Sequence, residues 1–400
     1  MYLRRKSDLT NEYISPNEDY IQENDFDKYV IPDKLNVGLS DESILSTAPE
    51  TIYCVDADGN QSTLTWREFG VSIDFNKAAN KNVSGTVVFE NVDFKQYSDK
   101  FDLMNCGAYE GEYLMLKFVN CRFGFFNNSY QEKTMNIVLK NCQFTRINSA
   151  DSDFEGRIEI YDCLITRGDD EAFASDGLNL GHYDCIIDGL YVKDLDKPAE
   201  SQGSAHQDGI QCVKNARLQF SRIRVEFPSL NYEYHIGTIN VPFYMEASAE
   251  GTKADHCIFN GGQWYCIATC KDTIFNKVHM GHSWNKDSGL GNGTKNCTQT
   301  DLEENSFAYI SSVWQESDGI HFLASNDTTS DQTIVIYTNK GKQEITLPYV
   351  SEKTVTSFDE LTIDKEYIIE DANYMVAFNN DRQIRFVNYT NNPIPKSILE

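Results

Sequence analysis

A short phrase recurs along the middle of the chain, and within each copy apolar and polar residues alternate around an Asn or Asp. The clearest copies contain four cysteines that follow one another at intervals of 21, 21 and 22 residues: Cys121, Cys142, Cys163 and Cys185. Weaker copies place an Asn or Asp at positions 91, 215, 255 and 272. Alternation with a period of two predicts β-strands. Repeats of roughly 20–30 residues built from short strands indicate a β-solenoid.

The repeat also predicts where each position of the phrase lies. Equivalent residues of neighbouring coils of a solenoid stack about 4.8 Å apart. We therefore expect the Asn and Asp residues to form a polar ladder at a corner, and the four cysteines one position later to form a buried column. The expected ladder is Asn120, Asn141, Asp162 and Asp184. A free cysteine packs as a small apolar side chain, so we expect these four to be unbridged.

The pattern divides the chain into three parts. Residues 1–50 are polar and irregular and predict an extended lead-in. Residues 51–305 carry the repeats, and residues 60–80 are expected to cap the first coil, because an exposed sheet edge invites strand addition. Residues 306–400 have strand-like segments without the phrase and predict a small C-terminal antiparallel β module. The predicted fold class is therefore all-β.

Composition excludes several partners. The chain has 35 Lys and Arg against 61 Asp and Glu, so its net charge is −26. Because nucleic-acid binding depends on basic side chains that neutralise phosphates, this balance predicts no nucleic-acid partner. The apolar runs are short, which predicts no membrane insertion. No apolar signal-peptide core follows the basic residues at the N-terminus, and the number of cysteines, 11, is odd. Both features favour folding in a reducing compartment.

The candidate catalytic or metal-binding residues are carboxylates that recur at a similar distance before the Asn or Asp of successive phrases. Glu155, Asp176 and Asp208 each precede a glycine by one residue, and we expect them to stack on consecutive coils. Stacked carboxylates repel each other, so they raise a pKa or recruit a cation. This arrangement suits acid/base catalysis on a glycosidic bond, with Asp208, Asp176 and His206 as catalytic residues, or a Ca²⁺ site made by the three carboxylates. The alternative is structural, because Asp-Gly is a common turn dipeptide.

His206 and Asp208 are two residues apart on an extended segment, so both side chains point to one side. That pairing offers an imidazole beside a carboxylate. Long insertions separate the repeats around this position, and insertions in solenoids project as loops over the binding face. The expected substrate-binding residues on this face are Gln211, Arg222, His235, Trp264 and Tyr265.

Four short motifs occur in a recognisable order: Asn36-Val-Gly38, Asp176-Gly-Leu-Asn-Leu-Gly181, His206-Gln-Asp-Gly-Ile-Gln211 and Phe259-Asn-Gly-Gly262. In this order the chain resembles a group of bacterial and phage right-handed parallel β-helix proteins that are related in fold to pectate lyases. The resemblance covers residues 31–275, and its most specific part is His-x-Asp-Gly-Ile-Gln. It implies a right-handed, three-sheet β-helix and a link to polysaccharides. It implies no particular reaction, because fold does not determine function in this superfamily.

Two functional interpretations follow. The first is a polysaccharide-degrading lyase or glycoside hydrolase, or a glycan-binding protein, that acts in a groove on the solenoid and is a monomer. The second is a phage tail-fibre or tailspike component, with or without depolymerase activity, which is expected to be a homotrimer. Either protein acts outside the cell or on a virion tail, with a polysaccharide or cell-surface glycan as its partner. The oligomeric state distinguishes the two interpretations.

Overall fold

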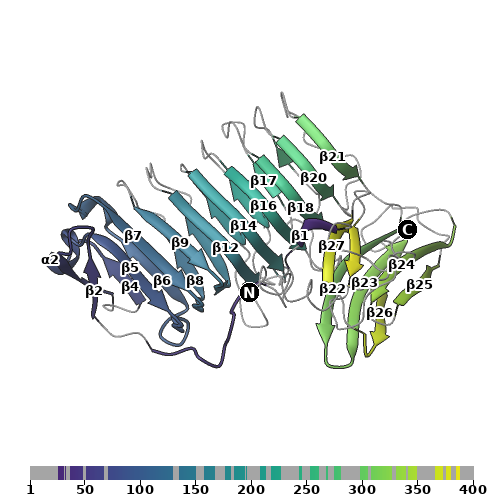
Figure 1. Cartoon of the computed structure of the whole chain (residues 1–400), viewed down its shortest axis with the longest axis horizontal. Coiled ribbons are helices and arrows are strands. Elements are labelled where there is room, and N and C mark those ends of the chain that lie inside the picture. The colour runs from purple at the N-terminus through teal and green to yellow at the C-terminus, as the bar shows by residue number, and fades with distance from the viewer. Residues whose placement is uncertain are drawn as a thin grey trace, which may run out of the picture.

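The structure is a computed structural model of the 400-residue chain. It describes residues 26–30, 32, 37–47, 51–66, 71–128, 135–149, 157–166, 176–181, 184–193, 195, 208–212, 218–226, 243–245, 253–260, 267–268, 274–280, 298–304, 308–326, 330–338, 341–348, 365–372, 375–379 and 384–387. In these residues the fold is all-β, and the two longest sheets are made of parallel strands (Figure 1). This arrangement confirms the predicted all-β class and is compatible with a β-solenoid.

The first sheet runs the length of the repeat region. Its strands lie in the order β3 (Gln61–Thr65), β2 (Thr51–Val55), β5 (Gly85–Glu90), β7 (Leu114–Val119), β9 (Asn136–Lys140), β12 (Arg157–Thr166), β14 (Asp184–Lys193), β16 (Leu218–Glu226), β18 (Lys253–Asn260), β20 (Ile274–Met280) and β21 (Thr298–Glu304). From β5 onward neighbouring strands are parallel, and β10 (Gln143–Phe144) also pairs with β12. β2 and β3 form an antiparallel hairpin at the end of the sheet.

The second sheet is parallel throughout and uses the chain between the strands of the first. Its order is β4 (Val71–Asp74), β6 (Lys100–Met104), β8 (Phe125–Asn127), β11 (Arg146–Ser149), β13 (Leu178–Leu180), β15 (Ile210–Cys212), β17 (Phe243–Met245) and β19 (Ile267–Ala268). Two short helices lie near the start of the repeats, α2 (Ala78–Lys81) and η2 (Cys106–Ala108). We call one strand of each sheet and the chain between them a coil.

A corner with left-handed backbone conformation lies within or just after the first-sheet strand in six consecutive coils, those of β5 to β16. Strand pairing aligns six such residues, all with positive φ: Asn91, Asn120, Asn141, Asp162, Gly189 and Arg222. Asn, Asp and Gly adopt this conformation at little cost. The predicted polar ladder is therefore correct from Asn120 to Asp162. It is wrong at Asp184, which pairs with Arg157 at the start of strands β14 and β12.

The interior between the two sheets is filled by columns of apolar side chains. Phe94, Phe123 and Phe144 stack on consecutive coils, with ring centroids 4.7 and 5.0 Å apart. Buried aromatic pairs of this kind contribute beyond the area that they bury. Trp66, at the end of β3, is completely buried and meets the rings of Phe89 and Phe94 edge-on.

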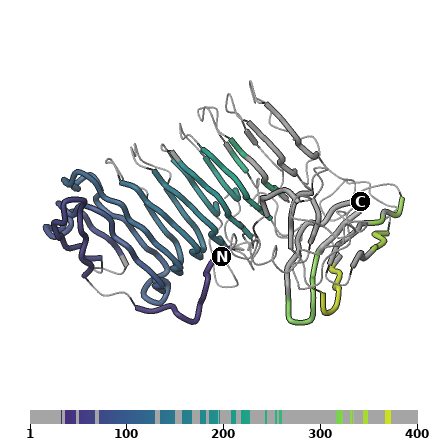
Figure 2. The backbone as a smooth tube through the Cα atoms, in the orientation of Figure 1, coloured from purple at the N-terminus to yellow at the C-terminus, as the bar shows by residue number. Residues whose placement is uncertain are grey.

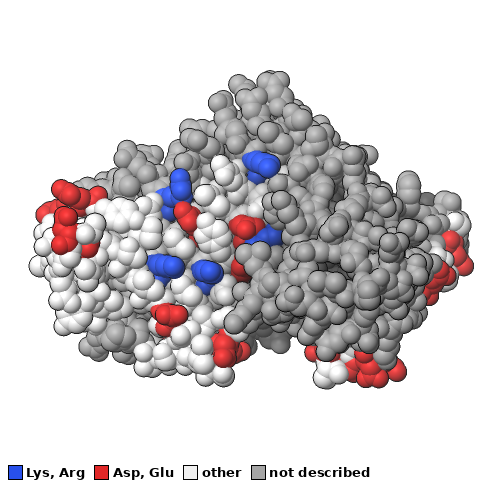
Figure 3. All heavy atoms as spheres, viewed as in Figure 1, with Lys and Arg blue, Asp and Glu red and all other residues white. Residues whose placement is uncertain are grey.

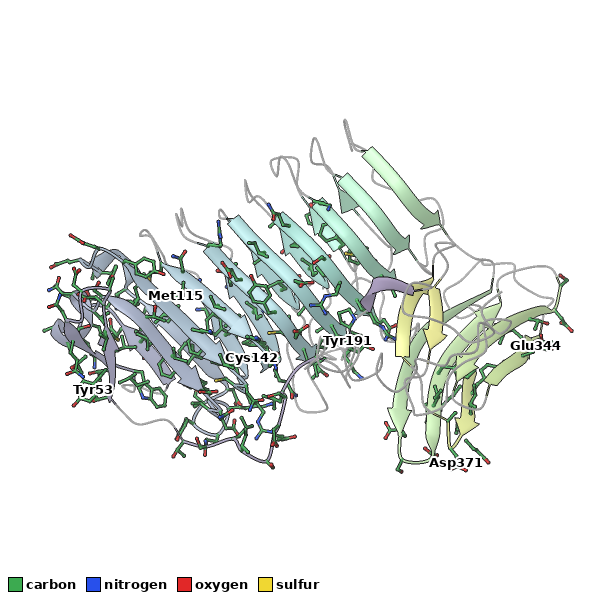
Figure 4. All side chains as sticks on the ribbon, in the orientation of Figure 1. Tyr53, Met115, Cys142, Tyr191, Glu344 and Asp371 are labelled. Atoms are coloured by element: carbon green, nitrogen blue, oxygen red, sulfur yellow. The ribbon has the colours of Figure 1, made fainter. Side chains whose placement is uncertain are left out.

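The cysteines form the predicted buried column over three coils only. Cys121, Cys142 and Cys163 occupy the position after the corner residue and are buried and unbridged, and Figure 4 labels Cys142 within the stack of strands. Cys185 is also buried and unbridged, but it pairs with Ile158 and so belongs to a different column. The error arises because the phrase at Cys185 lies at the start of strand β14, whereas the corner of that coil comes later, at Gly189.

The N-terminal segment (residues 37–47) crosses the corners of several coils, as the purple tube along the lower edge of Figure 2 shows. The Gly38 amide donates to the Asp162 carbonyl oxygen at 2.8 Å. The Ser40 amide and hydroxyl donate to Asn120 Oδ1 at 2.7 and 3.0 Å. This segment therefore connects coils that are distant from it in sequence, a contact that the sequence did not predict.

Antiparallel strands make up the C-terminal part. β22 (Ala308–Glu316), β23 (Gly319–Asn326) and β26 (Lys365–Glu370) form one sheet, and β24 (Gln332–Thr338) and β25 (Gly341–Leu347) form another. A third sheet contains β27 (Met375–Asn379), β28 (Ile384–Val387) and β1 (Phe26–Val30), which comes from the N-terminal lead-in. Pairing of β1 with β27 links the two ends of the chain.

Candidate functional site

Two of the predicted site residues stack one above the other at the start of adjacent strands. Asp176 and Asp208 each lie two residues before a strand of the second sheet, and the strands pair Leu178 with Ile210. The two coils are further joined by the Gly177 amide, which donates to the Asp208 carbonyl oxygen at 2.9 Å. The sequence thus located this carboxylate pair correctly.

Asp176 is buried and hydrogen-bonded on both carboxylate oxygens. Its Oδ1 accepts from the Asp208 amide at 3.0 Å, and its Oδ2 accepts from the Asn179 side-chain amide at 2.8 Å. Burial, and then the charge of Asp208, raise the pKa of Asp176 to about 6, although the hydrogen bonds and the charge of Arg146 act in the opposite direction. A carboxyl group with such a pKa exchanges its proton near neutral pH.

The third member of the expected column is not Glu155. Strand pairing places Thr145, also buried, at the position of the preceding coil that corresponds to Asp176. Glu155 was expected here because it precedes Asp162 by a distance similar to that from Asp176 to Asp184, but the second-sheet strand of that coil, β11, already begins at Arg146. Asp208 is completely buried. The described structure therefore contains a pair of stacked carboxylates rather than a column of three.

Several predicted residues lie outside the described residues, and their roles stay predictions. These are the catalytic candidate His206, the metal-ligand candidate Glu155 and the substrate-binding candidates His235, Trp264 and Tyr265. Within the described ranges, no cluster of three or more His, Cys, Asp or Glu side chains is arranged to hold a metal ion. The proposed Ca²⁺ site includes Glu155 and so stays a prediction.

A row of polar side chains runs across the outer face of the second sheet, beside the carboxylate pair. We call it the amide row; strand pairing aligns its members, which are Asp102, Asn127, Asn148, Asn179 and Gln211. Asn127 donates to Asp102 at 2.6 Å, and Asn148 donates to Asn127 at 3.0 Å. Asn179 donates to Gln211 at 2.7 Å. Gln211 was expected from the sequence, whereas the rest of the row was missed.

The basic side chains of the same face lie in a second row, next to the amide row. Phe125 pairs with Lys100 on one side and with Arg146 on the other. The Lys100 ammonium lies 5.5 Å and the Arg146 guanidinium 4.7 Å from the centroid of the Phe125 ring. Lys100 also forms an ion pair with Asp102 at 2.9 Å. Cation–π contacts and ion pairs thus hold both cations at the surface of the sheet.

Arg222, predicted to bind substrate, lies at a corner of the first sheet and is 6% exposed. Its guanidinium contacts Asp188 Oδ1 at 2.6 Å and Asp162 Oδ1 at 3.0 Å. These ion pairs account for the position of the side chain within the fold. Contact between Arg222 and a substrate stays a prediction.

Arg224, two residues further on, is 1% exposed and belongs to a separate cluster. Its Nε donates to Glu226 Oε1 at 2.8 Å, and its guanidinium lies 4.7 Å from the centroid of the Tyr191 ring, which Figure 4 labels. The Tyr191 hydroxyl donates to Glu226 Oε2 at 2.7 Å. Because these three side chains are buried and contact one another, the packing of the fold explains their positions.

Charge is distributed unevenly on the face of the molecule shown in Figure 3. Lys and Arg side chains there lie over the parallel sheets, whereas Asp and Glu side chains also occupy both ends. Among the described residues, no helix is long and apolar enough to cross a membrane.

The chain was compared with protein-family models, with curated proteins and with solved structures. None of the three comparisons finds a match. A functional assignment therefore depends on the geometry of the described residues.

Proposed function

We propose that this chain is a right-handed parallel β-helix protein that binds a polysaccharide along the outer face of its second sheet and cleaves it, with Asp176 as the acid/base group. The observation that carries this proposal is the position of Asp176. Its carboxyl group, with a pKa of about 6, is hydrogen-bonded to the amide row through Asn179. Rows of amide and carboxylate groups suit the many hydroxyl groups of a glycan, and a carboxyl group titrating near neutrality suits general acid/base catalysis.

In this proposal Asp208 acts through Asp176. Asp208 is also predicted from the sequence to be catalytic, but its complete burial does not suit direct contact with a sugar. Its negative charge raises the pKa of Asp176, the same effect that pairs of catalytic carboxyl groups use. His206 is proposed to supply the second acid/base group, because it precedes Asp208 by two residues.

The test is a screen of neutral and acidic polysaccharides with the full chain. Reducing ends report hydrolysis, and ultraviolet absorbance of unsaturated products reports β-elimination. Asp176→Asn is expected to lower the rate by about 100-fold or more, the usual size of an acid/base contribution. Asp58→Asn is the matched control, because Asp58 is an exposed carboxylate in the turn between β2 and β3 and lies outside the second sheet. Equal rates for Asp176→Asn and the unmodified chain would remove Asp176 from the mechanism.

A second candidate is a receptor-binding component of a virion, which binds a glycan with or without cleaving it. The observation that favours it is the buried, unbridged cysteine column, because such thiols are typical of a protein folded in a reducing compartment. Sedimentation equilibrium distinguishes the candidates. A homotrimer supports the virion component, and a monomer supports the free enzyme.

A further inference from the structure

The direction of every hydrogen bond in the amide row is determined by two carboxylates. A carboxylate accepts hydrogen bonds and does not donate, so the group that faces it has to be an NH2. Asp102 therefore orients Asn127, whose oxygen then accepts from Asn148. At the other side Asp176 orients Asn179, which donates its second hydrogen to Gln211.

The row thus consists of two runs that point in opposite directions. Asn148 donates toward the N-terminal coils, whereas Asn179 donates toward the C-terminal coils. These two residues are neighbours, paired across β11 and β13. Neither run uses Asn148 Oδ1 or Asn179 Oδ1, and Asn179 Oδ1 is buried without a hydrogen-bond partner. At the junction between the runs, the side-chain oxygens of Asn148 and Asn179 are the acceptors that neither run uses.

Asn179 Oδ1 is enclosed by protein atoms, so the oxygen of the junction that a ligand can reach is Asn148 Oδ1, on a half-buried side chain. A ligand group that donates a hydrogen to Asn148 Oδ1 gains a hydrogen bond on binding. Hydroxyl groups of a sugar are such donors. A carboxylate or sulfate group offers only acceptor oxygens and would meet the amide oxygen of Asn148, with Asp176 on the neighbouring coil. The junction therefore discriminates between neutral and acidic sugar units.

The charges on this face also favour a neutral glycan over an acidic one. Lys100 is paired with Asp102, and Arg146 lies over Phe125 and interacts with the charge of Asp176. Two cations are thus balanced by two carboxylates, and no excess positive charge remains among these four groups to attract a polyanion. The net charge of −26 adds long-range repulsion.

We propose that the outer face of the second sheet selects a neutral, hydroxyl-rich glycan over a polyuronate or sulfated glycan, with the Asn148–Asn179 junction accepting hydrogen bonds from a sugar hydroxyl. This inference rests on the proposed function, since it names the substrate class of the same face. Asn148 and Asn179 determine specificity in it, and neither acts as an acid or base.

The test compares matched ligands on the full chain by isothermal titration calorimetry. The probes are neutral hexose oligosaccharides and the same oligosaccharides oxidised at C6 to uronic acids, in which a carboxylate replaces each oxidised C6 hydroxymethyl group. The neutral form is expected to bind at least about tenfold more tightly, with little dependence on salt. Tighter binding of the oxidised form overturns this inference and leaves the proposed function intact. Binding of neither form overturns the proposed function, and the inference with it.

A pair of variants locates the effect. Asn148→Leu removes one acceptor of the junction and is expected to weaken binding of the neutral oligosaccharide about tenfold. Asn136→Leu makes the same replacement on β9 of the first sheet and is expected to leave the affinity unchanged. Thermal unfolding of both variants checks that each is folded. Unchanged affinity in a folded Asn148→Leu variant would place the binding surface elsewhere.

Discussion

Arg222 reaches Asp162 across an intervening coil, and Gly189 leaves the space for it to do so. Residues 162, 189 and 222 are the corner residues of three consecutive coils. The Arg222 guanidinium passes over Gly189, donates to Asp162 Oδ1 at 3.0 Å and is 2.6 Å from Asp188 Oδ1. A Cβ atom on residue 189 would collide with Asp162 Oδ1 and lie 2.9 Å from Arg222 Nη2. The glycine and the ion pair therefore depend on each other.

Gly189→Ala is expected to destabilise the fold by two separate effects. The residue has φ of +90°, which strains any side chain, and the new methyl group would force the buried ion pair apart. Gly59→Ala is the matched control, because Gly59 has φ of +85° but open space around it. In urea unfolding, Gly189→Ala should lose about 2 kcal/mol more than Gly59→Ala. Equal losses would show that the ion pair adapts to the methyl group.

Arg222→Asn is expected to be destabilising and to become less so as pH falls. Asn suits the left-handed backbone, where Arg222 has φ of +51°, so the backbone favours this replacement. The loss comes from Asp162, whose pKa burial already raises even with Arg222 present. Without the guanidinium, the ionised carboxylate is costly, and protonation at low pH relieves that cost. A difference in unfolding free energy that does not change with pH would contradict this explanation.

The sequence predicted the fold as far as the repeat stayed regular. Between Asn120 and Asp162 every coil adds 21 residues, and the phrase gave the correct corner and the correct cysteine column. At the next coil the corner becomes Gly189, 27 residues on, and the phrase loses its Asn or Asp. The copy at Cys185 resembles the phrase because it lies at the start of β14, where apolar and polar residues also alternate.

The sequence also predicted only part of the candidate site. Asp176 and Asp208 were placed together because each is followed by Gly and then by an apolar strand residue. The amide row was missed because its members come from five coils whose spacing varies, from 21 residues between Asn127 and Asn148 to 32 between Asn179 and Gln211. Which amide faces which depends on strand pairing, and a single sequence does not specify that pairing.

Asn120→Gly tests the attachment of the N-terminal segment. Glycine accepts the φ of +52° at this corner, so the replacement removes only the side chain. That side chain accepts from the Ser40 and Asp41 amides at 2.7 and 3.2 Å and donates to Asn91 Oδ1 at 2.8 Å. We expect faster amide hydrogen exchange in residues 38–46 and a loss of about 2 kcal/mol.

The control for this experiment is Asn141→Gly. Asn141 has the same φ, and its side chain makes no hydrogen bond to another described residue. Exchange in residues 38–46 should stay slow in this variant. If both variants release the segment equally, its attachment does not depend on the Asn120 amide.

The buried thiols are expected to resist modification while the protein is folded. Burial raises the pKa of Cys54 to about 11 and raises the pKa of Cys142 well above its usual range. Thiolates are the reactive form, so neither residue should react with an alkylating reagent at pH 8. Peptide-resolved mass spectrometry before and after denaturation provides the measurement. Labelling of Cys142 in the folded protein at the rate of an exposed cysteine would contradict its place in the column.

Asp176 should make the stability of the protein depend on pH in a direction opposite to that of an ordinary paired carboxylate. Its pKa is raised from 3.8 to about 6, so the folded state binds this proton more tightly than the unfolded state. Ionised Asp176 therefore lowers stability above pH 6, and that cost is relieved as pH falls through 6.

Asp176→Asn removes this titration. The free energy of unfolding of the variant, relative to the unmodified chain, should rise with pH from about 4 to 7 by up to about 3 kcal/mol, the equivalent of a two-unit pKa shift. Urea unfolding at a series of pH values measures it. Asp208→Asn provides an independent check, because removal of the neighbouring charge should lower the pKa of Asp176 and move the pH dependence downward. A pH-independent difference for Asp176→Asn would show that Asp176 is not the buried titrating group that the proposed mechanism needs.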